Sequence, residues 1–415
     1  MKEARDLEFK VVVNNSFLKT VSAFANYGKG TILFGVDDRG NEVGVDNPKQ
    51  ACLDIEHKIN DSISPMPDYS LEVNKRNNVI TLVVEKGMDV PYLYKAKAYK
   101  RHDTSTVEVD TLELKRLILE GENLTYDQTP SQNPHGTYKT LEKKLCAALG
   151  INALTDDMLK TLELIRFDGT QTIAGELFSD DNGILGIDIA RFGESIDIFL
   201  DRVRFEKESI LEQYDKALEM FRTFYTYEEV KGAERVRKES IPEEAYREAI
   251  ANALVHRQWD VRTAIRVAMH PDRIEIYSPG GLPKGLSEKD YLEGQVVVLR
   301  NPIVANVFFR LRLIESFGTG ILRIKNAYRH SKKKPRFKID ENVIVVTLPM
   351  VDENAELSDD EARVIDVLRG RKASTSELSS DTGFGKTKLQ KLLRGLEEGG
   401  YITISGRGRG TRYKA

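Results

Sequence analysis

The segment 242–257 carries the side chains whose types and spacing are best suited to chemistry. It reads PEEAYREAIANALVHR and is rich in Ala, Glu and Leu, with its proline in the tolerated first turn, so it predicts a helix. Glu248 and Asn252 fall one turn apart on the same face of this helix. A carboxylate can polarise water and an amide oxygen is a hard ligand for magnesium, so this face could bind a phosphate with its metal ion. The alternative is an ordinary solvated helix face.

Two glycine-containing segments further along the chain could complete a phosphate site. The first, 278–283, follows a predicted strand at 264–276, and the second, 315–321, begins another predicted helix. Glycine lets backbone N–H groups approach a phosphate closely, and the start of a helix adds favourable partial charge. The glycines concerned are Gly280, Gly281, Gly318 and Gly320.

The order of these features resembles the ATP-binding fold of the gyrase, Hsp90, histidine kinase and MutL superfamily. It is most similar to the divergent branch found in Schlafen-related bacterial regulators. The resemblance implies ATP and magnesium as cofactors, with Asn252 as the magnesium ligand and the two glycine pairs as the nucleotide-binding boxes. It also implies a water-activating role for Glu248, and hence a weak ATPase activity. In one respect the sequence departs from the superfamily, because Tyr-Ser-Pro at 277–279 stands where an adenine-reading Asp is expected.

A second candidate site lies near the N-terminus. The pattern Glu-x4-Glu-x-Lys at 3–10 and the turn Gly-Val-Asp-Asp at 35–38 resemble the Schlafen core, an AlbA-like domain. By that resemblance Glu3, Glu8 and Asp38 would hold a divalent metal ion. Lys10 matches the lysine of the pattern and could stabilise a leaving phosphate. The resemblance implies either a metal-dependent endoribonuclease acting on structured RNA or a domain that only binds nucleic acid or supports the fold.

The segment 97–106 (KAYKRHDTST) is a basic strand end that runs into hydroxyl residues. Lys100 and Arg101 could contact phosphates there, and Tyr99 could stack on a base. An exposed strand end with ordinary lysines is the alternative.

The elements that must position these residues indicate an α+β protein of several domains. Residues 1–120 alternate helix-like and strand-like segments and predict a mixed α/β, AlbA-like domain. Residues 121–140 are polar and predict a linker. Residues 141–351 would form the divergent ATP-binding α/β sandwich. Up to residue 351 we expect helices at 16–27, 51–63, 112–120, 141–149, 156–164, 209–227 and 242–257, and strands at 31–36, 70–73, 79–84, 96–100, 172–178, 184–191, 196–205, 264–276, 337–339 and 343–348.

Residues 357–415 predict three helices followed by a hairpin, the pattern of a winged helix-turn-helix. The helices are expected at 357–368, 375–382 and 386–398, with a glycine-rich wing around 406–410. The third helix would enter the DNA major groove, and the wing would contact phosphate or the minor groove. A winged helix that binds protein is the alternative. The candidate DNA contacts are Lys386, Lys388, Lys391, Arg394, Arg407, Arg409 and Arg412.

Composition limits the protein class. The chain has 415 residues, 31% of them charged, and a formal net charge of −3, which indicates a soluble protein that is not basic overall. We find neither an apolar run of about 18 residues nor an N-terminal signal pattern, so we expect no membrane span and a cytoplasmic location. The two cysteines are far apart and the six histidines lack zinc-ligand spacing, which argues against disulfides and zinc sites.

Together these patterns predict a DNA-binding transcriptional regulator whose ATP–magnesium domain switches the nucleic-acid-binding ends. The alternative is the metal-dependent endoribonuclease. The expected partners are DNA or RNA and a nucleotide. We also expect a homo-oligomer, as is common for winged-helix regulators, although no heptad pattern specifies one.

Overall fold

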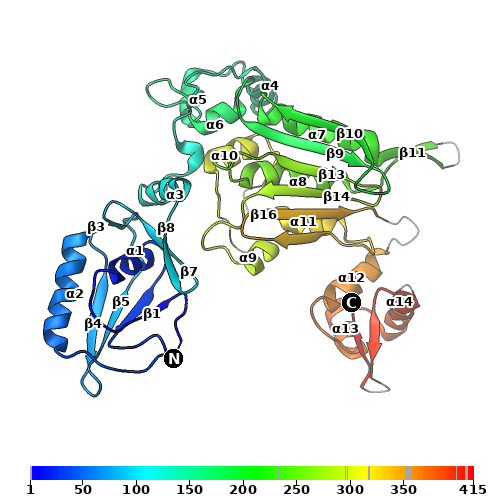
Figure 1. Cartoon of the computed structure of the whole chain (residues 1–415). Coiled ribbons are helices and arrows are strands. Elements are labelled where there is room, and N and C mark those ends of the chain that lie inside the picture. The colour runs from blue at the N-terminus through cyan, green and yellow to red at the C-terminus, as the bar shows by residue number, and fades with distance from the viewer. Residues whose placement is uncertain are drawn as a thin grey trace. The chain divides into compact units, whose positions relative to one another are not determined.

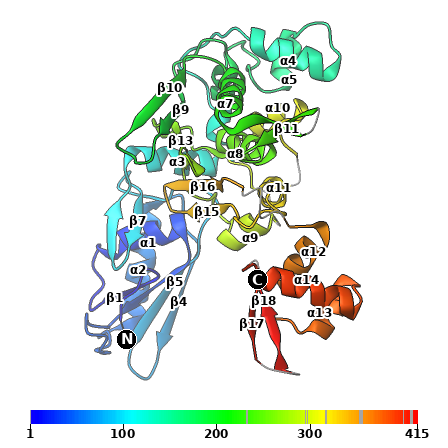
Figure 2. The same cartoon turned by 90° about the vertical axis from the view of Figure 1, so that its right-hand side faces the viewer.

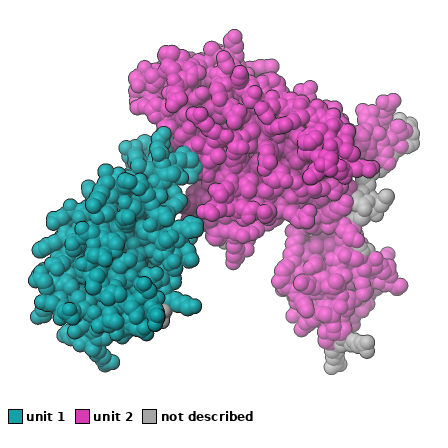
Figure 3. Space-filling model, viewed as in Figure 1, with its two compact units in different colours: residues 1–125 teal, residues 126–415 magenta. Residues whose placement is uncertain are grey.

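The computed structural model describes residues 2–231, 234–294, 296, 298–315, 318–351, 357–398, 400–406 and 410–415. The chain divides into two compact units, Met1–Thr125 and Tyr126–Ala415 (Figure 3). The boundary falls inside the expected linker, 121–140. That segment also contains structure, because the 3-10 turn Tyr126–Gln128 holds the fully buried Asp127.

The first unit is built on a four-stranded mixed sheet in the order β1–β2–β5–β4 (Figure 1). Strand β1 runs parallel to β2, and β5 runs antiparallel to both β2 and β4. Apolar side chains of helices α1 and α2 bury themselves against this sheet in one hydrophobic cluster. The bounds are β1 Leu7–Lys10, α1 Phe17–Tyr27, β2 Gly30–Phe34, α2 Pro48–Ser62, β4 Tyr69–Asn74 and β5 Val79–Val84.

Short elements complete the first unit. Strands β3 (Ile63–Ser64) and β6 (Leu93–Tyr94) pair with each other, as do β7 (Tyr99–His102) and β8 (Ser105–Glu108), and helix α3 (Thr111–Gly121) follows. The strand expected at 96–100 begins three residues later. Lys95 and Ala96 have φ values of 52° and 60°, so the backbone turns where the sequence pattern suggested an extended start.

The second unit contains a six-stranded sheet in the order β10–β9–β13–β14–β16–β15. Strands β9 and β13 are parallel, and the other neighbours are antiparallel. In β13 the side chains alternate, with Ile265, Val267 and Met269 buried and Arg266 exposed on the other face. The bounds are β9 Leu185–Phe192, β10 Phe199–Glu206, β13 Ile265–Met269, β14 Arg273–Pro279, β15 Arg336–Ile339 and β16 Val343–Pro349.

Helices cover the buried face of this sheet (Figures 1 and 2). Helix α7 contacts β9 and β10, and α8 contacts β14 and β16, while α10 and α11 rest on α8. In the described part of the chain, no helix is long and apolar enough to cross a membrane. The helices of this unit before residue 352 are α4 Lys139–Leu149, α5 Asp156–Thr161, α6 Ile173–Phe178, α7 Ile210–Tyr225, α8 Glu243–His256, α9 Glu288–Glu293, α10 Pro302–Arg310 and α11 Gly320–Ala327.

Several elements of this unit differ from the sequence prediction. The single strand expected at 264–276 is the antiparallel pair β13 and β14, and helices α9 and α10 were not predicted. The segment expected as a strand at 172–178 is helix α6, because the Thr172 side chain accepts a hydrogen bond from the Gly175 N–H and caps a helix start. The hairpin of β11 (Thr226–Lys231) and β12 (Glu234–Glu239) was not predicted. Its residues are mostly charged, so it lacks the apolar alternation that marks a strand.

The C-terminal segment contains the expected three helices and a two-stranded hairpin with a hydrophobic cluster of its own. Helices α12 and α13 begin with capping boxes, formed by Ser358 with Glu361 and by Ser374 with Glu377. Arg407 and Arg409 of the predicted wing lie outside the described residues. The bounds are α12 Asp359–Leu368, α13 Thr375–Thr382, α14 Lys386–Glu398, β17 Thr403–Ser405 and β18 Arg412–Lys414.

Candidate functional site

A cavity of about 320 Å³ opens between helix α8 and the six-stranded sheet. Apolar side chains of β14 and β16 form its floor, and α9, α10 and the start of α11 contribute to its walls. Helix α8 presents one side to this space, as the sequence predicted for that face. The α8 residues that line the cavity are Glu248, Ala249, Asn252, Ala253 and His256.

Glu248 and Asn252 lie together at one end of this cavity. The Glu248 side chain is buried, with 8% of the residue exposed. Burial raises the pKa of Glu248, while the Arg323 cation and a hydrogen bond from Asn252 act in the opposite direction. A buried carboxylate with a raised pKa is a better proton acceptor than an exposed one, which suits the polarisation of a water molecule.

The first residue of α11 comes up directly against this acid–amide pair. A Cβ atom added to Gly320 would lie 2.4 Å from Glu248 Oε1 and 2.6 Å from Asn252 Nδ2. A side chain at this position would therefore displace the ends of the Glu248 and Asn252 side chains, and glycine lets the backbone at the start of α11 approach them undisturbed. The acid, the amide and the N-terminal end of a helix therefore meet at one place.

The structure brings three of the four predicted glycines to the cavity. Gly281, Gly318 and Gly320 line it, and Gly318 has a φ of 67°, a conformation that favours glycine. Among the described residues, Gly280 is not part of the lining. Its N–H donates to the Asn342 carbonyl at 2.9 Å, and its φ of 102° serves the turn after β14.

Polar residues that the sequence analysis missed hold the other end of α8. The Arg300 guanidinium donates to the carbonyls of His256 (3.0 Å) and Gly281 (2.8 Å). Burial and the Arg300 cation lower the pKa of His256 to about 4, so its ring is neutral at neutral pH. The Asn301–Pro302 pair, a common helix start, was the only sequence signal for this region.

The same end of α8 is tied to α10 by buried polar contacts. The Asn301 amide donates to the carbonyls of Val255 (2.7 Å) and Arg257 (2.8 Å). The Asp127 carboxylate accepts from the N–H groups of Ile303 and Val304 at the start of α10. These bonds join residues far apart in sequence and keep α10 in place as a wall of the cavity.

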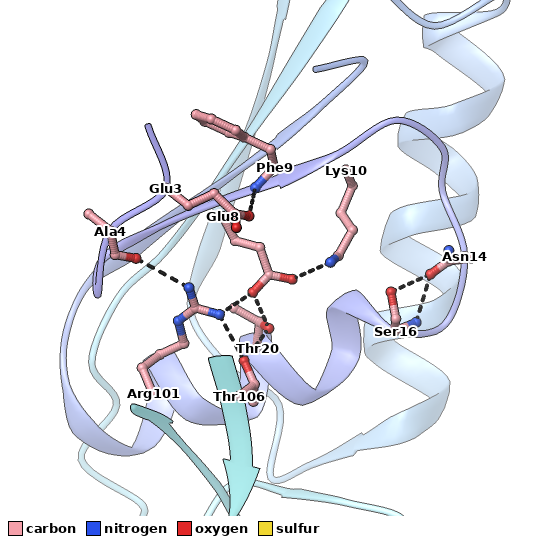
Figure 4. A network of polar contacts seen from close by, with 10 residues as sticks. All are labelled: Glu3, Ala4, Glu8, Phe9, Lys10, Asn14, Ser16, Thr20, Arg101 and Thr106. Atoms are coloured by element: carbon pink, nitrogen blue, oxygen red, sulfur yellow. Dashed lines mark hydrogen bonds and ion pairs between the residues drawn. The ribbon is translucent and has the colours of Figure 1, made fainter. Parts of the chain in front are cut away.

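The N-terminal acids form a different arrangement from the predicted metal centre (Figure 4). Glu8 is 4% exposed, accepts a hydrogen bond from Thr20 at 2.6 Å, and pairs with Lys10 at 2.6 Å and with Arg101. Two cations and a hydroxyl thus occupy the carboxylate that the sequence assigned to a metal ion.

The other two predicted metal ligands are not brought to Glu8 as a metal-binding group. Glu3 accepts the Phe9 N–H at 2.8 Å, and Asp38 lies exposed in the turn after β2. Within the described residues, no group of three acidic, His or Cys side chains could hold a metal ion. The three-carboxylate centre of Glu3, Glu8 and Asp38 is therefore not assembled, because Arg101 neutralises Glu8 instead.

The predicted phosphate contacts of the first unit are engaged within the protein. Arg101 is 7% exposed and also donates to Thr106 (3.0 Å) and to the Ala4 carbonyl (3.2 Å), so its guanidinium does not reach the surface. Lys100 forms an ion pair with Glu113 at 2.5 Å. The assignment of Arg101 to nucleic-acid binding is corrected by its burial.

In the C-terminal segment the predicted basic residues lie on the exposed side of α14. Lys386, Lys388, Lys391 and Arg394 are exposed, whereas three leucines of the same helix, Leu389, Leu393 and Leu396, are buried. Some of these cations have acidic partners: Lys388 pairs with Asp360 at 2.6 Å and Arg394 with Glu398 at 2.9 Å. Arg412 pairs with Glu377 at 3.3 Å.

Two protein-family models match parts of the chain. Residues 3–110 match the family described as "Schlafen, AlbA_2", and residues 263–348 match "Putative ATP-dependent DNA helicase recG C-terminal". The chain carries an AlbA-like domain and an ATPase-like domain. The second match spans both glycine segments but begins after α8, so it does not include Glu248 or Asn252.

Solved structures give a further comparison. The DIP2311 protein from Corynebacterium diphtheriae is 20% identical and has a TM-score of 0.52, covering 99% of this chain and 92% of that chain, which indicates a shared fold. The N-terminal domain of a RecG-related protein from Nitrosomonas europaea is 28% identical, covering 25% of this chain and 83% of that chain, with a TM-score of 0.20. Among curated proteins, no significant match was found.

Proposed function

We propose that this chain is a nucleic-acid-associated protein that binds ATP with magnesium in the cavity between α8 and the sheet. The observation that carries the proposal is the close approach of Gly320 to Glu248 and Asn252. The ATPase-like match over 263–348 supports it independently, since that region supplies the cavity floor and both glycine segments.

The residues of the cavity fit such a ligand. The Asn252 amide oxygen and the Glu248 carboxylate are hard oxygen donors at the end where α11 begins. Backbone N–H groups of Gly318 and Gly320 would bind phosphate oxygens without obstruction by a side chain. The apolar floor formed by β14 and β16 suits a planar base. When bound, ATP–magnesium supplies a triphosphate whose charge is partly neutralised.

The polar side chains of the cavity would have different roles toward this ligand. Asn252 would hold the metal ion, and Glu248 would polarise a water molecule, which would make the protein a weak ATPase. The Ser278 hydroxyl lines the cavity and donates to the Ala253 carbonyl at 3.3 Å, at the position where an adenine-reading carboxylate would stand. Its oxygen lone pairs would remain free to accept a hydrogen bond from a base.

We further propose that the protein is a cytoplasmic, homo-oligomeric transcriptional regulator. In this proposal residues 357–415 form a winged helix-turn-helix that binds DNA through α14, and nucleotide binding changes how the nucleic-acid-binding parts are presented. Two features support it: the exposed basic side of α14, and the AlbA-like match in the first unit.

Thermal unfolding with and without ATP and magnesium tests the nucleotide site. At a ligand concentration 100 times the Kd, binding should stabilise the second unit by about 2.7 kcal/mol and raise its midpoint temperature. Asn252→Ala should remove most of this stabilisation, whereas Asn152→Ala, on an exposed loop of the same unit, should keep it. No shift in the wild type, or an equal shift in Asn252→Ala, would rule out the site.

A further inference from the structure

A second, smaller cavity of about 230 Å³ is also lined by Glu248. Its lining is mostly charged and includes three arginines, which we call the arginine chamber. It shares Glu248, Ile314 and Glu315 with the larger cavity, so the two spaces adjoin at the predicted catalytic acid. The charged residues of the arginine chamber are Glu244, Arg247, Glu248, Arg312, Glu315 and Arg323.

The three arginines come from three elements that already surround the proposed nucleotide site. Arg247 precedes Glu248 on α8, and Arg323 lies one turn beyond Gly320 on α11. Arg312 lies in the connection between α10 and α11, where its φ is 57°. This left-handed conformation is common just after a helix, and here it ends α10, because the Leu313 N–H donates to the Phe308 carbonyl at 2.9 Å.

Two of the three guanidinium groups, those of Arg312 and Arg323, are available for exchange with a ligand, whereas Arg247 interacts with the Tyr214 hydroxyl. Arg323 Nη2 lies 3.1 Å from Glu315 Oε1, but both side chains are about half exposed, at 42% and 51%. Exposed ion pairs of this kind contribute little, so an anion can compete for the arginine. Within the described part of the chain, Arg312 forms no ion pair.

The charges of the arginine chamber indicate the class of ligand. Planar guanidinium groups bind phosphate oxygens through paired N–H donors. Three carboxylates offset the charge of the three arginines. The net charge of the arginine chamber therefore contributes little to the binding of a free anion. A phosphate could lie beside Glu248 only with a water molecule or a cation between them. This favours the last phosphate of a magnesium-bound chain over a free phosphate ion.

We propose that the arginine chamber binds the terminal phosphate of a nucleoside triphosphate whose base and ribose occupy the larger cavity. The inference rests on the proposed function and extends it, because it assigns the ligand that the protein distinguishes. A triphosphate reaches Arg312 and Arg323 and a diphosphate does not. Arg323 thereby connects the terminal phosphate to α11.

Calorimetric titration of the full chain, in the presence of magnesium, tests this assignment. The ligands are a non-hydrolysable ATP analogue, ADP and inorganic phosphate. Because each charge-assisted hydrogen bond contributes substantially, the wild type should bind the triphosphate on the order of 10-fold or more tightly than ADP. Inorganic phosphate alone should bind far more weakly than either nucleotide.

Variants separate the arginine chamber from the rest of the site. The double variant Arg312→Gln with Arg323→Gln should bind ADP like the wild type and lose the preference for the triphosphate. Arg323→Lys keeps the charge but not the paired donors, so it should retain only part of the preference. Arg336→Gln, on an exposed position of β15, is the matched control and should keep the full preference.

The outcomes distinguish this inference from the proposed function. If the wild type binds ADP and the triphosphate equally, or if the double variant weakens both alike, the arginine chamber does not read the terminal phosphate although the nucleotide site stands. Tight binding of inorganic phosphate alone would also overturn the assignment. If neither nucleotide binds the wild type, the proposed function fails as well.

Discussion

At the scale of single residues, the role of a charged side chain in this protein depends on which groups it contacts in the folded chain. Glu248 and Asn252 could be predicted because both belong to one helix and their spacing alone sets their common face. The role of Arg101 could not be predicted, because a basic segment has the same sequence whether its cations face solvent or a buried carboxylate. Arg300 escaped notice for a similar reason, because its partners His256 and Gly281 are distant in sequence.

The buried pair of Glu8 and Arg101 gives a prediction about stability. Arg101→Met leaves a buried carboxylate without its main cation and should lower the free energy of unfolding of the first unit by about 3–5 kcal/mol. Lys86→Met breaks the exposed pair with Glu120 and should cost about 0–1 kcal/mol. Urea unfolding followed by circular dichroism measures both. Equal costs would show that Glu8 does not depend on Arg101, which would contradict the assignment of Arg101 as its main partner.

At the scale of elements, the sequence pattern predicted α8, β16 and the helix that begins near Gly320, but it did not predict α9 or α10 and it merged β13 with β14. The helix expected at 242–257 is α8, and the strand expected at 343–348 is β16 (Val343–Pro349). The prediction failed where another signal prevailed. In α6 a capping threonine outweighed a short apolar run, and in the β11–β12 hairpin the charged side chains concealed the strands. The cavity itself could not be predicted without the fold, because its lining residues lie between Glu248 and Val346 on six different elements.

The contact between α8 and α11 can be tested at Gly320. Alanine at a helix start normally stabilises relative to glycine, so Gly320→Ala would be favourable if space were available. Instead the added Cβ would displace the ends of the Glu248 and Asn252 side chains. We expect a loss of about 1 kcal/mol in unfolding free energy, at the low end of overpacking costs, and loss of most of the stabilisation by ATP–magnesium.

Gly183→Ala is the control for this change. The nearest atom to its added Cβ is Glu176 Oε1 at 4.0 Å, so the substitution should leave both quantities nearly unchanged. Denaturant titration combined with nucleotide-dependent thermal unfolding measures them. If Gly320→Ala behaves like Gly183→Ala, α11 does not rest on the acid–amide pair.

At the scale of the whole molecule, the second unit joins the cavity to the C-terminal segment through α11. The helix begins at Gly320, and residues just beyond its end contact the segment that begins at Leu357. Arg329 pairs with Asp366 at 3.1 Å, and the Leu357 N–H donates to the His330 carbonyl at 2.8 Å. A change at the start of α11 therefore has a short physical route to α12, which fits the proposed switch.

Binding of DNA by the C-terminal segment is tested in the full chain. Replacing both Lys386 and Lys391 by Ala removes two exposed cations from α14 and should weaken DNA binding. The slope of log affinity against log salt concentration should fall by about two, because two fewer counterions are released. Lys143→Ala, at an exposed position of α4, should change neither quantity. Fluorescence anisotropy across a salt series measures both. An unchanged slope in the double variant would place the DNA contact elsewhere.

The central claim is that a nucleotide binds between α8 and the start of α11. A structure of the protein with a non-hydrolysable triphosphate and magnesium tests it most directly. We predict an ordered nucleotide between Asn252 and Gly318, with its last phosphate at Arg323. A cavity that stays empty at saturating ligand, or a nucleotide bound away from Glu248 and Asn252, would contradict the account.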